Sequence, residues 1–313
     1  VQLAEGGCTE LILVAQETTL YGKDLYGRKM LPELLERLCG IDGIRWIRIL
    51  YAYPEEITDE LIETMARQPK ICHYLDIPIQ HASDRILKRM GRRTTRSDIE
   101  TTVGKLRSAI PDIVLRTTLI SGFPGETQED HEILMDFVDR MAFERLGVFP
   151  YSPEEGTPAA DFPDQIPDEI KESRRDELMT LQQEISAEFL ESRTGEVLDV
   201  IIEGRIPEDN VLVGRTYMDT PDIDGYIFID AYKTGVAGVT LGVGRNKTTD
   251  PVCPDAGIIL NARTGDYVKA GTDIMEIYGK DDECLAPALS MLQDAVTYSD
   301  KAPEKNPLIY KQI

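Results

Sequence analysis

The chain has 313 residues, of which 42% are hydrophobic, so it is long enough for two or three domains with substantial cores. It contains 34 basic and 56 acidic residues and has a formal net charge of -22. This balance argues against nonspecific nucleic-acid binding, which needs a basic face. An acidic surface is compatible with a basic protein partner, although it also simply keeps a protein in solution.

Membrane insertion is not expected, because no stretch approaches the roughly 20 apolar residues that a membrane helix needs. The N-terminus carries no basic and apolar signal segment, so we expect a cytoplasmic protein with reduced thiols. The cysteines and histidines form no metal-spaced cluster, and we predict no metal site from them. They are Cys8, Cys39, Cys72, Cys253, Cys284, His73, His81 and His131.

Strand-like and helix-like segments alternate along the first half of the chain. Apolar runs predict strands over residues 10–16, 46–53, 74–79, 113–121 and 145–151. Helical spacing of apolar residues and N-cap residues predict helices over 31–38, 58–67, 83–90, 96–110 and 128–141. Repeated β-then-α units imply a parallel sheet with helices outside it.

The alternation of strands and helices ends after about residue 160. Residues 163–167 read as a proline-bearing linker, and residues 168–192 read as one long helix with an apolar stripe. The stripe consists of Leu178, Leu181, Ile185 and Phe189. Short apolar runs over 196–202, 211–217 and 225–229 then predict a small β region.

The end of the strand at 113–121 is the most informative local feature. The strand breaks into Gly122-Phe123-Pro124-Gly125, and a helix with acceptors in its first turn follows. The two glycines allow backbone to approach a ligand closely, and loops at such strand ends bind small molecules in α/β folds. The segment therefore predicts a binding loop, while a plain tight turn explains the same residues equally well.

Three segments together carry a resemblance to a known family. They are residues 115–127, residues 145–160, and residues 74–81 with the nearby Met90-Gly91-Arg92. Over about residues 1–228 the chain resembles the radical S-adenosylmethionine (SAM) methylthiotransferases, most closely the RimO type, which methylthiolates an aspartate of a small-subunit ribosomal protein. The resemblance implies SAM and 4Fe-4S clusters as cofactors and a small-subunit ribosomal protein as partner.

The resemblance also implies the fold. The family has a six-unit (β/α) barrel, of which five units are visible, so we expect an α/β fold with a partial radical-SAM-type barrel. A linker helix and small β-rich domains should follow. Residues 231–237, 241–245, 255–258 and 300–310 carry a second resemblance. From about residue 229 the chain resembles the C-terminal α+β domain of pyrimidine-nucleoside (thymidine) phosphorylases. The implied domains are 1–162 (partial barrel), 163–195 (linker helix), 196–228 (partial TRAM-like β region) and 229–313 (phosphorylase-like domain).

The resemblance assigns a set of residues at carboxyl-terminal strand ends to the SAM pocket. Loop structure alone would explain each of them equally well. They are Gln16, Thr18, Gln80, His81, Arg116, Ser121, Gly122, Tyr151 and Ser152.

Individual roles follow from the same resemblance. Gln16 and Thr18 are implied to lie where the methionyl amino group is contacted. Arg116 offers a fork of donors to a carboxylate or ribose, and Ser121 and Gly122 are implied to approach the adenosine.

The cluster-binding loop of the family, Cys-x-x-x-Cys-x-x-Cys, is not in the sequence. Because three thiolates must hold the cluster, we expect the chain alone to be inactive and assign no catalytic or metal-binding residue. Three alternatives stay open. They are a pyrimidine-nucleoside phosphorylase fragment with a glycosyl-transfer role, a non-catalytic ribosomal-protein-binding module, and two unrelated reading frames joined near Ile229.

Overall fold

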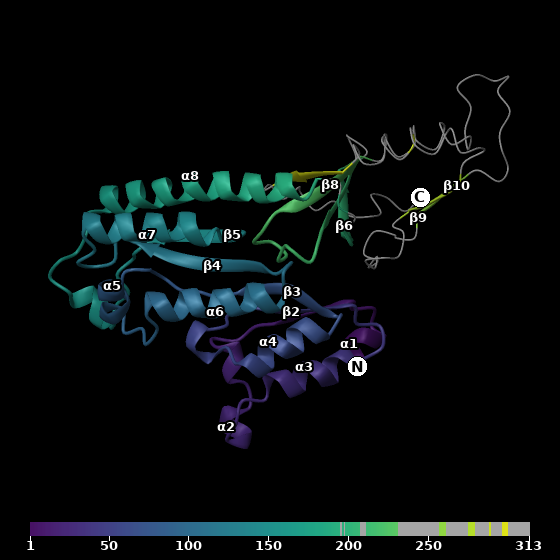
Figure 1. Cartoon of the computed structure of the whole chain (residues 1–313), viewed down its shortest axis with the longest axis horizontal. Coiled ribbons are helices and arrows are strands. Elements are labelled where there is room, and N and C mark those ends of the chain that lie inside the picture. The colour runs from purple at the N-terminus through teal and green to yellow at the C-terminus, as the bar shows by residue number, and fades with distance from the viewer. Residues whose placement is uncertain are drawn as a thin grey trace, which may run out of the picture. The chain divides into compact units, whose positions relative to one another are not determined.

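The structure is a computed structural model that describes residues 1–194, 196, 198–206, 211–230, 257–260, 275–278, 288 and 296–299. It divides into two compact units, Val1–Arg193 and Thr194–Ile313, and each is described by itself. Figure 1 shows the labelled elements of both. No helix in the described part of the chain is both long and apolar enough to cross a membrane.

The first unit is built on a parallel five-stranded sheet in the order β1-β2-β3-β4-β5. Each strand is followed by at least one helix before the next begins, which confirms the predicted α/β class. The strands are β1 (Glu10–Leu13), β2 (Trp46–Ile49), β3 (Ile71–Asp76), β4 (Val114–Ser121) and β5 (Arg145–Pro150).

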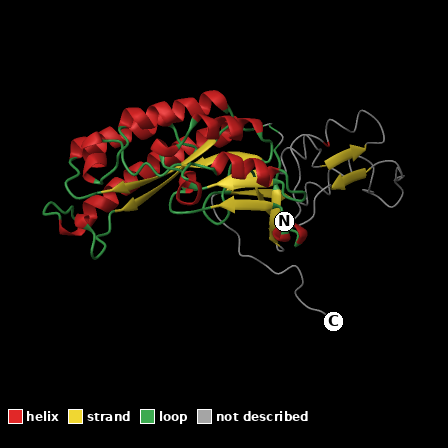
Figure 2. Ribbon diagram, turned by 90° about the horizontal axis from the view of Figure 1, so that it is seen from below, coloured by secondary structure: helices red, strands yellow, loops and turns green. Residues whose placement is uncertain are grey.

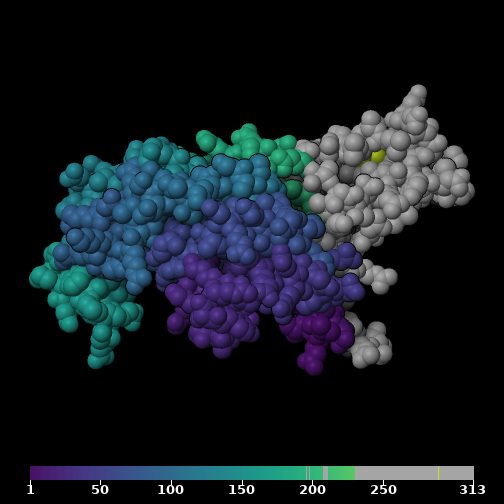
Figure 3. Space-filling view, turned by 60° about the horizontal axis from the view of Figure 1, so that its bottom comes forward, coloured from purple at the N-terminus to yellow at the C-terminus, as the bar shows by residue number. Residues whose placement is uncertain are grey.

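The helices of this unit match the predicted ones closely. The short 3-10 helices are η1 (Thr18–Leu20), η2 (Pro54–Glu56) and η3 (Pro158–Asp161). The α-helices are α1 (Gln2–Glu5), α2 (Lys23–Tyr26), α3 (Leu31–Cys39), α4 (Asp59–Arg67), α5 (Asp84–Arg89), α6 (Arg96–Ala109), α7 (Gln128–Met141) and α8 (Asp168–Ser192). Most of them gather on one side of the strands (Figure 2). The N-terminal part of the chain, purple to blue, covers one continuous face of the unit (Figure 3).

Side-chain caps explain where several helices begin. The hydroxyl of Thr58 accepts the N–H of Leu61 at the start of α4, as the sequence predicted. Thr95 opens α6 and Thr127 opens α7, each in a capping box with an aspartate three residues later. Such caps satisfy N–H groups that the first helical turn leaves without partners.

Four strand boundaries differ from the prediction by three residues or more. β1 ends at Leu13 rather than at residue 16. β2 ends at Ile49 rather than at residue 53, and the chain turns soon afterwards at Tyr51, whose φ is 61°. β3 begins at Ile71, which pairs beside Ile47 of β2, and it ends at Asp76 rather than at residue 79. Pro78 follows this end and has no N–H to continue a ladder.

The two faces of the parallel sheet differ in chemistry because side chains alternate along a strand. One face is apolar and packs under the helices, with Ile47, Leu75 and Leu115 buried in the same core as Phe137. The residues next to them along the strands point to the opposite face. That face carries two ion pairs between neighbouring strands, Arg48 to Glu10 at 2.9 Å and Arg116 to Asp76 at 3.0 Å.

Helix α8 has the predicted bounds, but its buried face is more polar than predicted. Leu178 is fully buried, and Leu181 and Ile185 are only partly buried against the core. Lys171, Arg174 and Gln182 fill the rest of the buried face. Sequence reasoning missed them because a helix can bury a polar side chain only where acceptors on other segments meet it.

The second unit contains antiparallel sheets. β6 (Ile201–Ile206), β7 (Val211–Arg215), β8 (Tyr226–Asp230) and β11 (Val296–Ser299) form one sheet in the order β11-β8-β7-β6. β9 (Gly257–Leu260) pairs with β10 (Met275–Tyr278). The predicted strand 196–202 starts only at Ile201, because Ile201 lies opposite Arg215, the last residue of β7.

The predicted domain boundary between residues 228 and 229 falls inside β8. β11, from the phosphorylase-like segment, pairs with β8, so both predicted domains contribute strands to one sheet. Of the segments on which the phosphorylase resemblance rests, residues 231–237, 241–245 and 300–310 lie outside the described residues, and Gly257 and Ile258 are the described part of residues 255–258.

Candidate functional site

Most of the predicted site residues lie at or just beyond the carboxyl ends of the parallel strands, where such sheets place ligands. Arg116 was wrongly placed there, because it is the third residue of β4 and lies five residues before that strand ends. Ser121 ends β4, and its hydroxyl donates to the carbonyl of Lys171 in the first turn of α8 at 3.0 Å. The chain then turns at Gly122, whose φ is 68°. A Cβ on Gly122 would collide with Lys171, and one on Gly125 would collide with Asp164. The space beside both glycines is therefore filled by the protein itself, rather than left for a ligand.

Glu126 holds this turn in place. Its fully buried carboxylate accepts the N–H of Gly122 at 2.7 Å and of Phe123 at 3.1 Å. The guanidinium of Arg174 from α8 donates to the other oxygen at 2.9 Å and to the Glu126 carbonyl at 3.1 Å. The loop after β4 is thus locked internally and tied to α8. Sequence reasoning noted Glu126 only as an acceptor and did not find its partner on α8.

His81 lies in the interior beside this turn. It is fully buried, and its Nδ1 accepts the backbone N–H groups of Ala82 and Ser83, both at 2.9 Å. The remaining ring nitrogen, Nε2, therefore carries the proton. It lies 3.7 Å from the carboxylate of Glu126, which is too long for a hydrogen bond. His81 is therefore a buried residue that supports the loop, whereas a ligand would contact the exposed strand ends.

Arg116 lies on the charged face of the sheet, one strand away from Asp76. Its guanidinium donates to Asp76 at 3.0 Å and to the hydroxyl of Thr118 at 3.1 Å. Asp76 also accepts the N–H of Tyr51 at 3.3 Å. Sequence reasoning missed Asp76, although its place at the end of β3, directly opposite Arg116 in the register, is a usable signal.

The loop after β1 contributes one exposed and one buried residue. Gln16 is exposed, whereas Thr18 is buried and donates its hydroxyl to the Leu50 carbonyl. Between them, the carboxylate of Glu17 accepts the N–H of Thr19 at 2.9 Å and of Tyr53 at 3.0 Å. Burial raises the pKa of Glu17 despite these hydrogen bonds, which lower it. Glu17 thus joins the first two strand-end loops and was not predicted.

Two non-glycine residues at these strand ends have left-handed backbone. Tyr51 follows β2 with a φ of 61°, and Gln80 follows β3 with a φ of 71°. Gln80 is held there by backbone hydrogen bonds to Thr118 and Ile120 of β4. Such conformations cost of order 1–3 kcal/mol each and cluster at functional sites. Gln80 was predicted as a site residue; Tyr51 was not.

Tyr151 and Ser152 lie where β5 ends. The N–H of Tyr151 donates to the Ser121 carbonyl at 2.8 Å, and its ring packs edge-on against Phe123 at 5.2 Å. Burial raises the pKa of Tyr151, and Glu154 raises it further. The Tyr151 hydroxyl is buried without a hydrogen-bond partner among the described residues. It is therefore a polar atom that a ligand could satisfy, whereas Ser152 is exposed.

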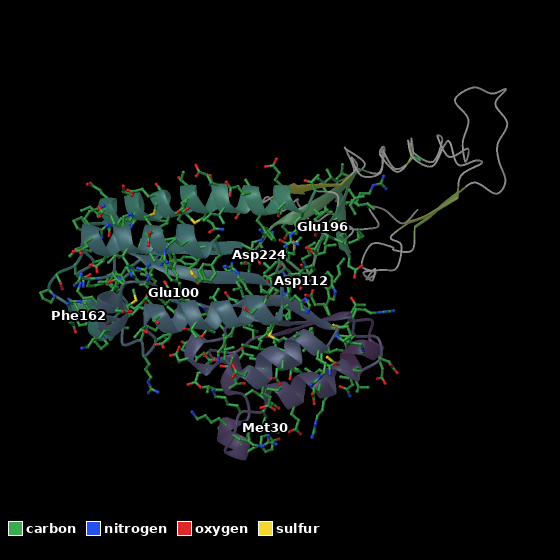
Figure 4. All side chains as sticks on the ribbon, viewed as in Figure 1. Met30, Glu100, Asp112, Phe162, Glu196 and Asp224 are labelled. Atoms are coloured by element: carbon green, nitrogen blue, oxygen red, sulfur yellow. The ribbon has the colours of Figure 1, made fainter. Side chains whose placement is uncertain are left out.

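The segment before α8 packs against the same end of the sheet. The Phe162 ring, labelled in Figure 4, lies edge-on to Phe123 at 6.3 Å. The guanidinium of Arg89 stacks over Phe162 at 4.7 Å and pairs with Asp164. Asp164 and Arg89 also lie beside Gly125, so these contacts cover the end of the turn.

Asp130 joins the start of α5 to the start of α7. Its carboxylate accepts the hydroxyls of Ser83 and Thr127, each at 2.6 Å, and an ion pair from Arg85. Burial raises the pKa of this carboxyl, but the hydrogen bonds from Arg85, Ser83 and Thr127 outweigh it and hold the pKa well below its usual range.

The described residues do not fit an iron–sulfur cluster. Cys8, Cys39 and Cys72 lie on separate elements. Within the described ranges, no group of three His, Cys, Asp or Glu side chains could hold a metal ion. We therefore derive no reaction step through a cluster. SAM is a different case, because exposed Gln16, the fork of Arg116 and the Tyr151 hydroxyl are groups that fit a polar, zwitterionic ligand.

Three family models match the chain. The radical SAM superfamily matches residues 1–138, the TRAM domain matches residues 194–245, and the pyrimidine nucleoside phosphorylase C-terminal domain matches residues 226–299.

Curated relatives match the N-terminal part strongly. The protein called ribosomal protein uS12 methylthiotransferase RimO from Lachnoclostridium phytofermentans is 65% identical over 227 residues, which is 72% of this chain and 52% of the relative. Its namesake from Acetivibrio thermocellus is 56% identical over 72% of this chain and 50% of that protein. The chain spans about half the length of these relatives. The resemblance to RimO-type methylthiotransferases is thus confirmed for this N-terminal part.

Solved structures are more distant. Coproporphyrinogen III oxidase (HemN) from Escherichia coli, a radical SAM enzyme, has a TM-score of 0.43 and 14% identity over 64% of this chain and 51% of that chain. The radical SAM methyltransferase TsrM from Kitasatospora setae has a TM-score of 0.39 and 17% identity over 48% of this chain and 29% of its own.

The first prediction concerns the anchor of the turn. Glu126→Gln should destabilise the first unit by about 3–5 kcal/mol, because it leaves the buried Arg174 without its charge partner. Urea unfolding followed by the fluorescence of Trp46, the single tryptophan, measures it.

The exposed neighbour Glu129→Gln serves as control and should change stability by less than about 0.5 kcal/mol. The double variant Glu126→Gln/Arg174→Gln should lose less than the sum of the two single losses. Strict additivity would contradict the assigned coupling.

The second prediction concerns pH. Because the folded pKa of Asp130 is depressed, its stabilisation is complete above the unfolded value of about 3.9 and is lost as the pH falls below it. Asp130→Asn should therefore cost about 1–3 kcal/mol at pH 7, and the difference from the parent should shrink as the pH falls towards 3. Asp139→Asn, exposed on the same helix, should be neutral throughout. A constant deficit at every pH would show that the charge of Asp130 is not what stabilises the fold.

Proposed function

We propose that residues 1 to about 228 are the SAM-binding and substrate-binding part of a RimO-type methylthiotransferase. The observation that carries the proposal is the 65% identity over 227 residues to a protein named as a uS12 methylthiotransferase. The parallel sheet with polar side chains at its carboxyl edge supports it. The whole protein's reaction would be the methylthiolation of an aspartate of the small-subunit ribosomal protein uS12.

In this function the strand-end residues bind SAM. Arg116 presents a planar fork that suits a carboxylate or a ribose, and Asp76 holds it in position at 3.0 Å. Exposed Gln16 offers an amide oxygen that accepts from an amino group. Tyr151 contributes a hydroxyl whose hydrogen-bonding capacity is unused among the described residues.

The turn at Gly122 has a supporting role in this proposal. Its N–H groups are already taken by Glu126, so it shapes the site and does not donate to the ligand. The radical chemistry that the family performs needs an iron–sulfur cluster bound by three thiolates. No described residues fit that cluster, and the role proposed for these residues is therefore binding alone.

The third prediction tests SAM binding by the full chain, measured by isothermal titration calorimetry. Gln16→Ala should weaken SAM binding several-fold, and Arg116→Met should weaken it roughly tenfold or more, as expected when a hydrogen bond to a charged group is lost. Arg93→Met removes an exposed arginine from the loop after α5 and should leave the affinity unchanged.

Because Arg116→Met also removes the partner of buried Asp76, its melting temperature is measured alongside. Gln16 is exposed, so Gln16→Ala should change the SAM affinity without changing the melting temperature. Unchanged affinity in the Gln16 and Arg116 variants, with binding intact in the parent, would remove both residues from the SAM site.

The fourth prediction tests whether this chain by itself is inactive. Reconstitution of the purified 313-residue chain with iron and sulfide should leave it without a stoichiometric cluster, as judged by visible absorption and iron analysis. The physical reason is the missing thiolate tripod. Uptake of one cluster per chain would overturn the expectation, while leaving the SAM-binding result as an independent measure.

A phosphorylase role ranks second. It rests on the match of residues 226–299 to the C-terminal domain of pyrimidine nucleoside phosphorylases. β9 with β10, and β11 paired with β8, are the parts of this match that the structure describes beyond residue 230. The structure describes the backbone pairing of these strands. The N-terminal proposal is preferred because it rests on 65% identity over 227 residues to a curated relative, whereas the phosphorylase role rests on a family-model match alone.

A further inference from the structure

A shallow groove of about 780 Å³ runs along α8 beside α7. The two helices lie side by side (Figure 1). Its lining includes five carboxylates and no lysine or arginine, and we call it the acidic groove. The lining positions on α8 extend from Glu169 to Glu184, which at 1.5 Å per residue is about 22 Å or four helical turns. That length suits an extended or helical peptide segment rather than a small molecule.

The floor of the groove is apolar. Met135 of α7 and Leu181 of α8 line it, and both are partly buried hydrophobic residues packed against the main core. The carboxylates stand along it on one side of α8. The groove therefore presents an apolar strip beside an acidic edge.

The negative charge of the groove is only partly compensated. Arg175 of α8 pairs with Asp176, and His131 of α7 pairs with Glu177, whereas Glu169, Glu172 and Glu184 have no ion pair within the described part of the chain. The other cations on this stretch of α8 are turned inward, because Lys171 is 5% exposed and Arg174 is 7% exposed. Those two cations pair with Asp168 and Glu126 instead.

Placing like charges this way costs the helix stability. Glu172 and Asp176 lie four residues apart, and Glu169 and Glu172 lie three apart, so each pair repels by about 0.2–0.5 kcal/mol. Local helix stability therefore does not explain the arrangement. A partner of opposite charge would turn the repulsion into attraction.

We propose that the acidic groove docks a basic protein segment in which lysines or arginines flank apolar residues. The apolar residues would cover Met135 and Leu181, and the cations would meet Glu172 and Glu184. A nucleic acid is excluded by the sign of its charge. The net charge of -22 would speed the encounter with a basic segment. This inference concerns binding along α8 and stands independently of the SAM site.

The fifth prediction tests the groove with the full chain and a defined probe. The probe is a fluorescent 15-residue peptide of lysine and leucine at helical spacing, followed by fluorescence anisotropy. The parent should bind it with an affinity that falls as salt rises. Glu172→Lys/Glu184→Lys should weaken binding at least tenfold.

The matched control is Glu188→Lys/Glu191→Lys, which changes two exposed carboxylates on the same helix by the same total charge but outside the groove. It should weaken binding less than threefold. A copy of the peptide with glutamate in place of lysine should not bind the parent.

Two results would overturn the proposal. One is equal weakening by both double variants, which would mean that only the overall charge attracts the peptide. The other is no binding of the peptide by the parent at low salt. If the lysine variant fails to fold, as judged by circular dichroism, Glu172→Gln/Glu184→Gln replaces it and should still weaken binding several-fold.

Discussion

The ion pair between Glu126 and Arg174 is the contact on which the site depends. It joins the loop after β4 to α8 across 48 residues of sequence, with both side chains buried. Removing two charges from water costs several kcal/mol per ion, so such a pair persists only when additional hydrogen bonds satisfy it. The N–H groups of Gly122 and Phe123 supply those bonds. One interaction thereby fixes a turn, a helix and the spacing between them.

The two faces of the parallel sheet differ in polarity. The helix-covered face is apolar, while the opposite face carries the pairs Arg48–Glu10 and Arg116–Asp76. Both pairs bridge neighbouring strands, so each charge is compensated laterally within the sheet. The face keeps charged groups where a polar ligand can bind, and it does so without isolated buried charges. This arrangement supports the proposed SAM-binding role of the strand ends more firmly than any single residue does.

The sequence predicted the elements well because they depend on local signals. The alternation of apolar runs gave the parallel sheet, and α8 has its predicted bounds. Prediction from the sequence failed where the role of a residue depends on contacts between distant segments. Nothing local marks Asp76 as the partner of Arg116, 40 residues away, or Glu126 as the partner of Arg174, 48 residues away. The two glycines were predicted to let backbone approach a ligand, whereas in the structure Lys171 and Asp164 fill the space beside them.

Helix α8 shows how one element can serve two surfaces. Arg174 holds the loop at Gly122 through Glu126, the Lys171 side chain packs beside Gly122, and the outward carboxylates of the helix line the acidic groove. A lysine at position 172 or 184 would reduce the negative charge of the groove, and a carboxylate at position 174 would repel Glu126. The same division of charge therefore stabilises the loop beside the proposed SAM site and leaves the opposite side of the helix negative. A partner bound along the groove would therefore contact the same helix that positions the loop.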